Sequence, residues 1–197
     1  MKRRKAAIHR KTRETDIHVR LDVDGKGHCR VETGIGFMDH MLELFGRHAL
    51  LDLDVRARGD LHVDDHHTVE DLGLVLGTAL DRALGERRGI RRYGWCVLPM
   101  DDALSMVGLD LGGRPYFVYR LRDDVPAIRG FDTGLIEEFL RAFVVQSRMN
   151  LHVLQLDGRE PHHVFECIFK AIARALRMAA EAAPRERGRV PSSKGII

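Results

Sequence analysis

The chain has 197 residues, of which 44% are hydrophobic and 31% charged, so it can bury a core as one large domain or two small ones. Its formal net charge of +3 is too small to indicate a nucleic-acid-binding protein. No apolar stretch approaches the roughly 20 residues that cross a bilayer, and none follows the basic N-terminus as in a secretory signal. We therefore expect no membrane role and a cytoplasmic location, which three widely spaced cysteines also suit.

The first half of the chain predicts two strands, a helix, a strand and a second helix. The first two segments alternate or favour strand residues and are separated by Gly25 and Gly27, which indicates a β-hairpin. Apolar residues at helical spacing predict the two helices, and alternation predicts the strand between them. These elements are expected at residues 15–23, 29–33, 37–45, 50–58 and 65 to 85 or 89.

The second half repeats this pattern. Its expected strands are residues 95–99, 104–111, 114–120 and 150–156, and its helices are residues 135–147 and 161–182. The interval from His40 to His66 nearly equals that from Glu138 to His162. Such self-similarity predicts an α+β fold, a duplicated β-α-β-α unit with two sheets and the helices packed between them. Residues 1–92 are the first repeat, and 93–197 the second, with a flexible C-terminal tail from about residue 185.

Histidine usage indicates metal or acid-base chemistry. The 11 histidines include the pairs His66–His67 and His162–His163, each opening a His-His-x-x-Glu segment in a predicted helix. On a helix the first His and the Glu share a face, while the second His points about 100° away. One such segment is as easily a solvated or capping feature, but two matched copies favour metal binding. Each helix would then serve two ions, shared between repeats or between subunits.

The residue types narrow the choice of metal. Imidazole and carboxylate groups without thiolates suit manganese, zinc or iron, and a six-coordinate site with open positions favours manganese. We therefore predict Mn²⁺, two ions per active site.

The order of the motifs resembles the imidazoleglycerol-phosphate dehydratase family from about residue 8 to the C-terminus. The first helix opens with GIGFMDHML, the first metal motif is DDHHTVED and the tail ends in PSSKG. The segments that support the resemblance are residues 13–15, 34–42, 64–71, 99–104, 113–116, 162–166 and 191–195.

The resemblance implies dehydration of imidazole glycerol phosphate to imidazole acetol phosphate, in L-histidine biosynthesis. It also implies a homo-oligomer of 24 subunits with dimanganese sites at subunit interfaces. Glu138 departs from the family pattern, which commonly has His there, but a carboxylate can still bind manganese; His152 is the alternative ligand. The implied metal ligands are His40, His66, His67, Glu70, Glu138, His162, His163 and Glu166.

The resemblance further assigns catalytic roles to Glu14, His67 and Glu166, with Glu14 as acid or base at the substrate hydroxyls. The substrate phosphate is expected to contact Arg92, Arg114, Ser192 and Lys194. Asp101 and Asp102 are either turn residues or partners that orient the histidines.

Two other function classes compete. A dinuclear metal hydrolase acting on a small phosphorylated substrate would use similar ligands, although hydrolysis gives no reason for a phosphate set beside an imidazole-sized site. A nucleic-acid-binding protein would suit the α/β unit, which resembles that of ribosomal protein S5 domain 2, and the basic N-terminus. That hypothesis leaves both His-His-x-x-Glu segments unexplained, so we expect a small-molecule partner and no nucleic acid.

Overall fold

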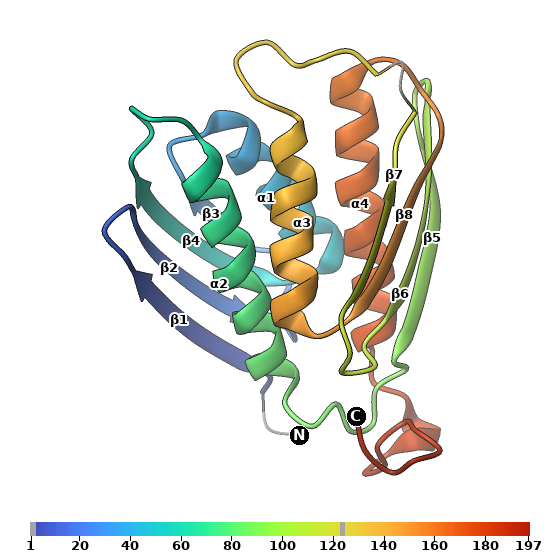
Figure 1. Ribbon diagram of the computed structural model, residues 1–197. Helices are drawn as coiled ribbons and strands as arrows, with labels where there is room; N and C mark the ends of the chain where they lie inside the picture. Colours follow the sequence, from blue (N-terminus) through green and yellow to red (C-terminus); the bar gives the residue numbers. More distant parts are fainter. Residues whose placement is uncertain (1–2, 123–124) are drawn as a thin grey trace.

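The computed structural model describes residues 3–122 and 125–197. Two four-stranded sheets form the outer layers, and four long helices lie between them (Figure 1). The first sheet contains β1 (Lys5–Lys11), β2 (Thr15–Asp22), β3 (Cys29–Glu32) and β4 (Asp52–Gly59). The second contains β5 (Tyr93–Met100), β6 (Ala103–Asp110), β7 (Tyr116–Arg120) and β8 (Asn150–Asp157). The helices are α1 (Gly36–Ala49), α2 (His66–Leu84), α3 (Gly134–Ser147) and α4 (Pro161–Ala180), and a 3₁₀ turn, η1 (Pro184–Glu186), follows.

The two sheets have the same topology. Their strand orders are β1-β2-β4-β3 and β5-β6-β8-β7, and in each the last pair is parallel and the other pairs are antiparallel. The predicted α+β class, with a duplicated unit and helices between two sheets, is confirmed. Within the described part of the chain, no helix is long and apolar enough to span a membrane.

The predicted hairpin between residues 15–23 and 29–33 is wrong. Strand β4 lies between β2 and β3, and β3 runs parallel to β4. Parallel neighbours need a crossover, which α1 provides, just as α3 connects β7 to β8. The loop before β3 is tied to β4 instead, because Asp52 Oδ1 accepts hydrogen bonds from the backbone N–H groups of Lys26 and His28, at 2.8 and 3.1 Å.

The sequence reasoning also missed β1, so each unit is β-β-β-α-β-α. The strand lies at the sheet edge and is rich in Lys and Arg. Basic side chains are common on edge strands, where they oppose pairing with another chain. Only Ala6 and Ile8 pack against the core, so the apolar alternation that reveals a strand is weak here.

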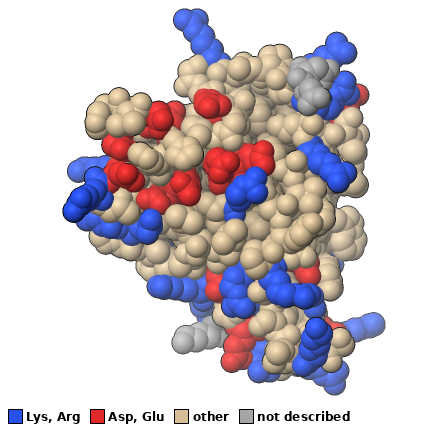
Figure 2. All heavy atoms as spheres, viewed as in Figure 1, with Lys and Arg blue, Asp and Glu red and all other residues tan. Residues whose placement is uncertain are grey.

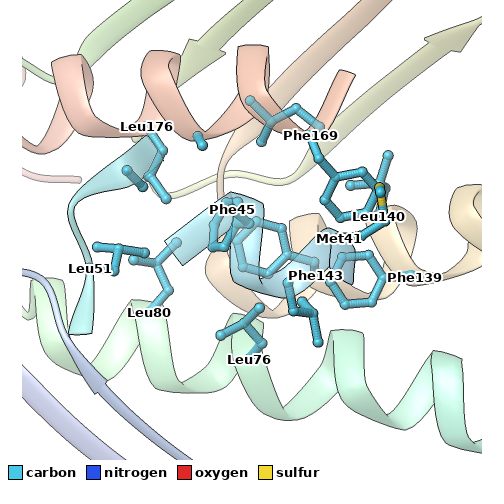
Figure 3. Packing of buried hydrophobic residues seen from close by; sticks show 14 of the residues in the cluster. Met41, Phe45, Leu51, Leu76, Leu80, Phe139, Leu140, Phe143, Phe169 and Leu176 are labelled. Carbon is cyan, nitrogen blue, oxygen red and sulfur yellow. The ribbon is translucent and has the colours of Figure 1, made fainter. Parts of the chain in front are cut away.

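The core lies where the helices of the two halves meet. Figure 3 shows Phe45 of α1 beside Phe143 of α3, with Phe139 and Phe169 close by. The rings of Phe45 and Phe143 are 5.8 Å apart and nearly perpendicular, and Phe139 stacks on Phe143 at 6.1 Å. Such aromatic pairs add about 0.5–1.5 kcal/mol each to the burial of apolar area. The packing thus joins the two repeats into one core.

Helices α2 and α3 touch almost backbone to backbone. A Cβ atom added at Gly73 would lie 2.4 Å from the Phe139 carbonyl oxygen, and one at Gly77 would lie 2.6 Å from that of Phe143. Both contacts advance by four residues in the same direction, so the helices are parallel. Glycine is needed here for close approach, despite its low helix propensity.

We predict that Gly77→Ala lowers the stability of the protein. Alanine favours a helix over glycine by about 1 kcal/mol, but overpacking at the helix contact costs about 1–3 kcal/mol. Thermal unfolding followed by circular dichroism measures the balance. Gly36→Ala is the matched control, because a Cβ on that helical glycine meets no atom within 4 Å. Equal unfolding temperatures for both variants would contradict the predicted role of the close contact.

Candidate metal centre

The predicted ligands lie in the first turns of the helices, and all four helices begin at one end of the molecule. In Figure 1 this end is at the top, where the chain enters α2, α3 and α4. His40 lies in the first turns of α1, Glu138 in those of α3, and the two histidine pairs in the first turns of α2 and α4. Figure 2 shows acidic side chains gathered over the upper part of the helical face. This end therefore offers both imidazoles and negative charge.

Three predicted ligands from the two repeats converge. Glu166 Oε2 lies 3.3 Å from His40 Nε2 and 3.2 Å from His162 Nε2. Their three ligand atoms lie within 4.8 Å of one another, and the two imidazole rings stack at 5.3 Å. His162 and Glu166 are neighbours on α4 because they are four residues apart. His40 joins them because α1 packs on α4.

Lys170 fixes the carboxylate of this cluster. Its Nζ lies 2.5 Å from Glu166 Oε1, which leaves Oε2 facing the histidines. Burial of Glu166 acts to raise its pKa, but hydrogen bonds from Lys170 and His40 outweigh it, so the pKa lies below the usual value. The group is thus held as an anion, the form that binds a metal ion. Sequence reasoning missed Lys170, although its spacing of four from Glu166 could have revealed it.

The first-repeat motif forms a second, more open group. His66 Nε2 and Glu70 Oε2 lie 3.6 Å apart on α2, as the spacing of four predicted. The rings of His66 and His67 are 6.0 Å apart at 79°, so the second histidine does face another way. Glu138 lies one residue before Phe139, which packs against α2, and its carboxylate is 4.0 Å from Arg141 Nε.

The second histidine of each pair is oriented by an aspartate. His67 Nδ1 donates to Asp60 Oδ2 at 3.0 Å, and His163 Nδ1 donates to Asp102 Oδ1 at 2.8 Å. These hydrogen bonds raise the pKa of both histidines. They also leave Nε2 as the nitrogen available to a ligand. For Asp102 the sequence left two roles open, a turn residue or an orienting partner, and the contact with His163 supports the second. Asp60 was missed because its spacing to His67 follows no helical rule.

Asp102 also shapes the start of α4. Its Oδ2 accepts hydrogen bonds from the backbone N–H groups of Arg159, at 2.8 Å, and Glu160, at 3.1 Å. These two bonds, with that from His163, hold the pKa of Asp102 well below its usual value. Glu160 then caps the helix through the His163 N–H. One carboxylate therefore fixes both the histidine ring and the helix that bears it.

Glu14 lies beside His67. It is in the turn between β1 and β2, and its Oε1 is 4.0 Å from His67 Nε2. Its carbonyl oxygen accepts a hydrogen bond from Asp60 N at 3.1 Å. By contrast, His152 is exposed on β8 and stacks on Tyr116 at 5.9 Å, on the sheet face away from the helices. The structure places this alternative ligand apart from the others.

The predicted phosphate residues gather at the opposite end of the molecule. Arg92 N donates to the Ala179 carbonyl in the last turn of α4, roughly 25 Å from His162 at the helical rise of 1.5 Å per residue. Ser192 and Lys194 lie in the C-terminal tail, and Pro191 of this tail accepts a hydrogen bond from Arg92 at 2.9 Å. Arg114 follows Gly113, next to the tail residue Ile197.

The Arg92 guanidinium already has partners. It forms two hydrogen bonds with Asp110, at 2.7 and 3.1 Å, and lies over the Tyr93 ring. The hydrogen bond to Asp110 raises its pKa. The arginine therefore stays charged and rigid at the base of the tail. Figure 2 shows further basic side chains around this lower end.

Comparison with known proteins decides the family. The sequence model described as Imidazoleglycerol-phosphate dehydratase matches residues 33–176. A protein of that name from Gluconacetobacter diazotrophicus is 54% identical over 194 residues, which cover 98% of each chain. The chain belongs to this family. The match covers nearly the full length of the chain, including the His-His-x-x-Glu segments and the tail motif. The predicted family is confirmed.

Solved structures of the family have the same fold. The crystal structure of IGPD from Pyrococcus furiosus in complex with (S)-C348 superposes with a TM-score of 0.82 at 34% identity, covering 96% of this chain and 100% of that one. Imidazoleglycerol-phosphate dehydratase from Staphylococcus aureus gives 0.80 at 36% identity, with 91% and 99% covered. The family is one of hydro-lyases, so the matches do not support the alternative of a metal hydrolase.

We predict that Asp102→Asn weakens metal binding by about 10–100-fold, because loss of a carboxylate partner loosens the histidine ring and lowers its basicity. Asp60→Asn should act in the same way through His67. Titration of the metal-free protein with Mn²⁺, followed by calorimetry, measures the change. Asp101→Asn removes an equal charge next in sequence, but the Asp101 carboxylate lies 3.6 Å from Nε2 of His163 and does not hold its Nδ1, so this variant should have a smaller effect. Equal affinities for the Asp101 and Asp102 variants would contradict the orienting role.

Proposed function

We propose that the chain dehydrates imidazole glycerol phosphate to imidazole acetol phosphate in histidine biosynthesis, at a site with two manganese ions shared between subunits. The observation that best supports this function is the convergence of His40, His162 and Glu166 in a member of the dehydratase family. The family implies dependence on a metal, and the residues present fit one. Two imidazole nitrogens and a carboxylate oxygen are donors that manganese accepts, and no thiolate competes.

The ligands divide into two sets. His40, His162 and Glu166 form one set, and His66, Glu70 and Glu138 correspond to it by the internal repeat. His67 and His163 are instead hydrogen-bonded to Asp60 and Asp102, and each lies about 100° around its helix from the histidine before it. We assign His67 and His163 to ions bound mainly by another subunit. This assignment uses all eight predicted ligands and gives two ions for each site.

The separation of the two ends supports an oligomer. The phosphate set lies roughly 25 Å from the ligand cluster, as measured along α4, which exceeds the length of a small substrate. A substrate can contact both sets only if they come from different subunits. We therefore propose a homo-oligomer, with 24 subunits as the family resemblance implies, and active sites at its interfaces.

The residues of the chain hold the metal ligands in place and move protons at the substrate. When bound, the metal ions polarise the substrate imidazole and so acidify the neighbouring carbon-bound hydrogen. Glu14, beside His67, exchanges protons at the substrate hydroxyls, so that a hydroxyl and a carbon-bound proton leave together as water. Glu166, held as an anion by Lys170, keeps the ligand cluster in place. We also assign a catalytic role to His67, as the family resemblance implies.

The phosphate is bound at the other end of the site. Arg114 and Lys194 supply charge-assisted donors, Ser192 supplies a hydroxyl, and Arg92 supports the tail through Pro191. We propose that the tail, from about residue 185, moves to close over the phosphate.

Chelation should abolish the activity, and Mn²⁺ should restore it. The reason is that, without the metal, the carbon-bound hydrogen of the substrate is too weakly acidic for a carboxylate base to remove. Production of imidazole acetol phosphate is measured after chelator treatment, with Mn²⁺ or Mg²⁺ added back; Mg²⁺, which prefers oxygen ligands, is the control. Full activity of the metal-free protein would contradict the mechanism.

Mixed oligomers should test the shared site. A His162→Ala chain, which lacks a member of the ligand cluster, and a Lys194→Ala chain are each expected to be inactive. When the two chains are co-expressed, the oligomers should recover about a quarter of wild-type activity. Chains that pair at random form about a quarter of their sites with an intact ligand set from one chain and an intact phosphate set from the other. Arg114→Ala mixed with Lys194→Ala is the matched control and should stay inactive, since both residues belong to one set. No recovery in either mixture would indicate that the site lies within one chain.

Glu138→Gln should reduce the bound manganese, because the amide keeps the shape but loses the charge that binds a hard cation. Metal content per chain, determined by mass spectrometry, measures the loss. Glu137→Gln is the matched control on the preceding residue, whose carboxylate pairs with Arg141 at 2.5 Å. If both variants retain the wild-type metal content, Glu138 is no ligand.

A further inference from the structure

A second group of metal-binding side chains lies outside the candidate centre, on the outer face of the first sheet. His9 of β1 and His18 of β2 are directly opposite in the antiparallel register. Asp16 lies two residues before His18 and so points to the same face. In the described part of the chain, this group and the cluster of His40, His162 and Glu166 are the two that could hold a metal ion with three ligands.

The three side chains converge on one point. His9 Nε2 lies 2.8 Å from Asp16 Oδ1, and His18 Nε2 lies 3.3 Å from the same oxygen. The two imidazole rings stack with their centroids 3.8 Å apart and an interplanar angle of 10°. Lys11 contacts the other carboxylate oxygen, Oδ2, at 3.1 Å. Oδ1 and both Nε2 atoms therefore remain together on the exposed face.

We propose that His9, Asp16 and His18 bind a divalent cation of the zinc type. Zinc bonds to imidazole nitrogen and carboxylate oxygen at about 2.0–2.2 Å, so neighbouring ligand atoms of a tetrahedral site are about 3.4 Å apart. The observed separations of 2.8 and 3.3 Å are shorter than this by about 0.6 and 0.1 Å. Because the two rings are stacked nearly parallel, they must rotate out of the stack for both Nε2 atoms to face one ion. Three protein ligands leave the fourth position to water.

The environment makes this site different from the candidate centre. All three side chains are at least partly exposed, and Arg56 and Arg58 of β4 lie opposite His18 and Asp16 in the sheet. These positive charges oppose a cation, whereas the Asp16 carboxylate attracts it. We therefore expect weaker binding than in closed structural zinc sites. A bound ion would join the edge strand β1 to β2 at a point where neither side chain is buried.

A metal-free network is the competing explanation. Both histidines as neutral Nε2–H tautomers can donate to the one Asp16 oxygen, and the stacked rings then need no ion. The two explanations differ in the zinc that the chain retains. The proposal does not depend on the dehydratase activity, because none of the three residues belongs to the proposed catalytic or binding machinery.

The test is the zinc content of the full-length protein after dialysis against about 10 µM Zn²⁺, a concentration chosen for a site weaker than a structural one. The variants are Asp16→Asn, which nearly keeps the shape of the side chain, and His18→Asn, which only shortens it. Each should retain about one zinc ion per chain less than the wild type. Zinc bound at the helix ends is the same in all proteins, so the difference reports only this site. The matched control is His28→Asn, which removes an exposed histidine beside a single carboxylate, Asp52, at 3.4 Å.

The control should retain as much zinc as the wild type. A second measurement is the rise in unfolding temperature on adding Zn²⁺, because an ion that binds only the folded chain stabilises it. This rise should be smaller in both variants than in the His28 variant. Unchanged circular dichroism and dehydratase activity confirm that the variants fold. Equal zinc content in the wild type, both variants and the control would overturn the proposal and leave the metal-free network.

Discussion

The close parallel packing of helices from different halves is the constraint on which the rest of the structure depends. Gly73 and Gly77 let α2 approach the backbone of α3, and α1 packs on α4. Because all four helices then begin at one end, their first turns meet there. His40 of the first half consequently lies 3.3 Å from Glu166 of the second. Neither half alone could assemble this ligand cluster.

The same packing explains why each motif contains two adjacent histidines. A helix presents residues i and i+4 on one face, so His162 and Glu166 serve the cluster with His40. The next residue points outward, where Asp102 orients it, and Asp60 does the same for His67. The fold thus has the same arrangement twice: a His–Glu pair on one helix face and a neighbouring histidine that an aspartate holds. On the proposed assignment the second histidine binds an ion of another subunit, which a closed assembly allows at every site.

Sequence reasoning predicted the helices, most strands and the helix-face geometry of the motifs, because these follow from periodicity. It failed where contacts between residues far apart in the sequence decide the structure. The glycines between β2 and β3 indicated a hairpin, but the crossover helix α1 makes β3 a parallel neighbour of β4. Strand β1 gave too little apolar alternation to be recognised. Asp60 and Lys170 were missed because the first meets His67 only through tertiary contact and the second lies beyond the His-His-x-x-Glu segment, one helical turn after Glu166. The repeat itself was the most reliable guide.

Distance gives the strongest argument about how the site is completed. The helices that bring the proposed ligands together also hold the proposed phosphate residues apart from them, because α4 runs from His162 to the segment that Arg92 contacts. A rigid helix of roughly 25 Å cannot shorten, and the core of stacked phenylalanines prevents the sheets from folding over it. Movement of the tail would shift Ser192 and Lys194, but it would leave Arg92 and Arg114 in place. The proposed ligand and phosphate sets can therefore act on one small substrate only as parts of different chains, and this is why we propose an oligomer.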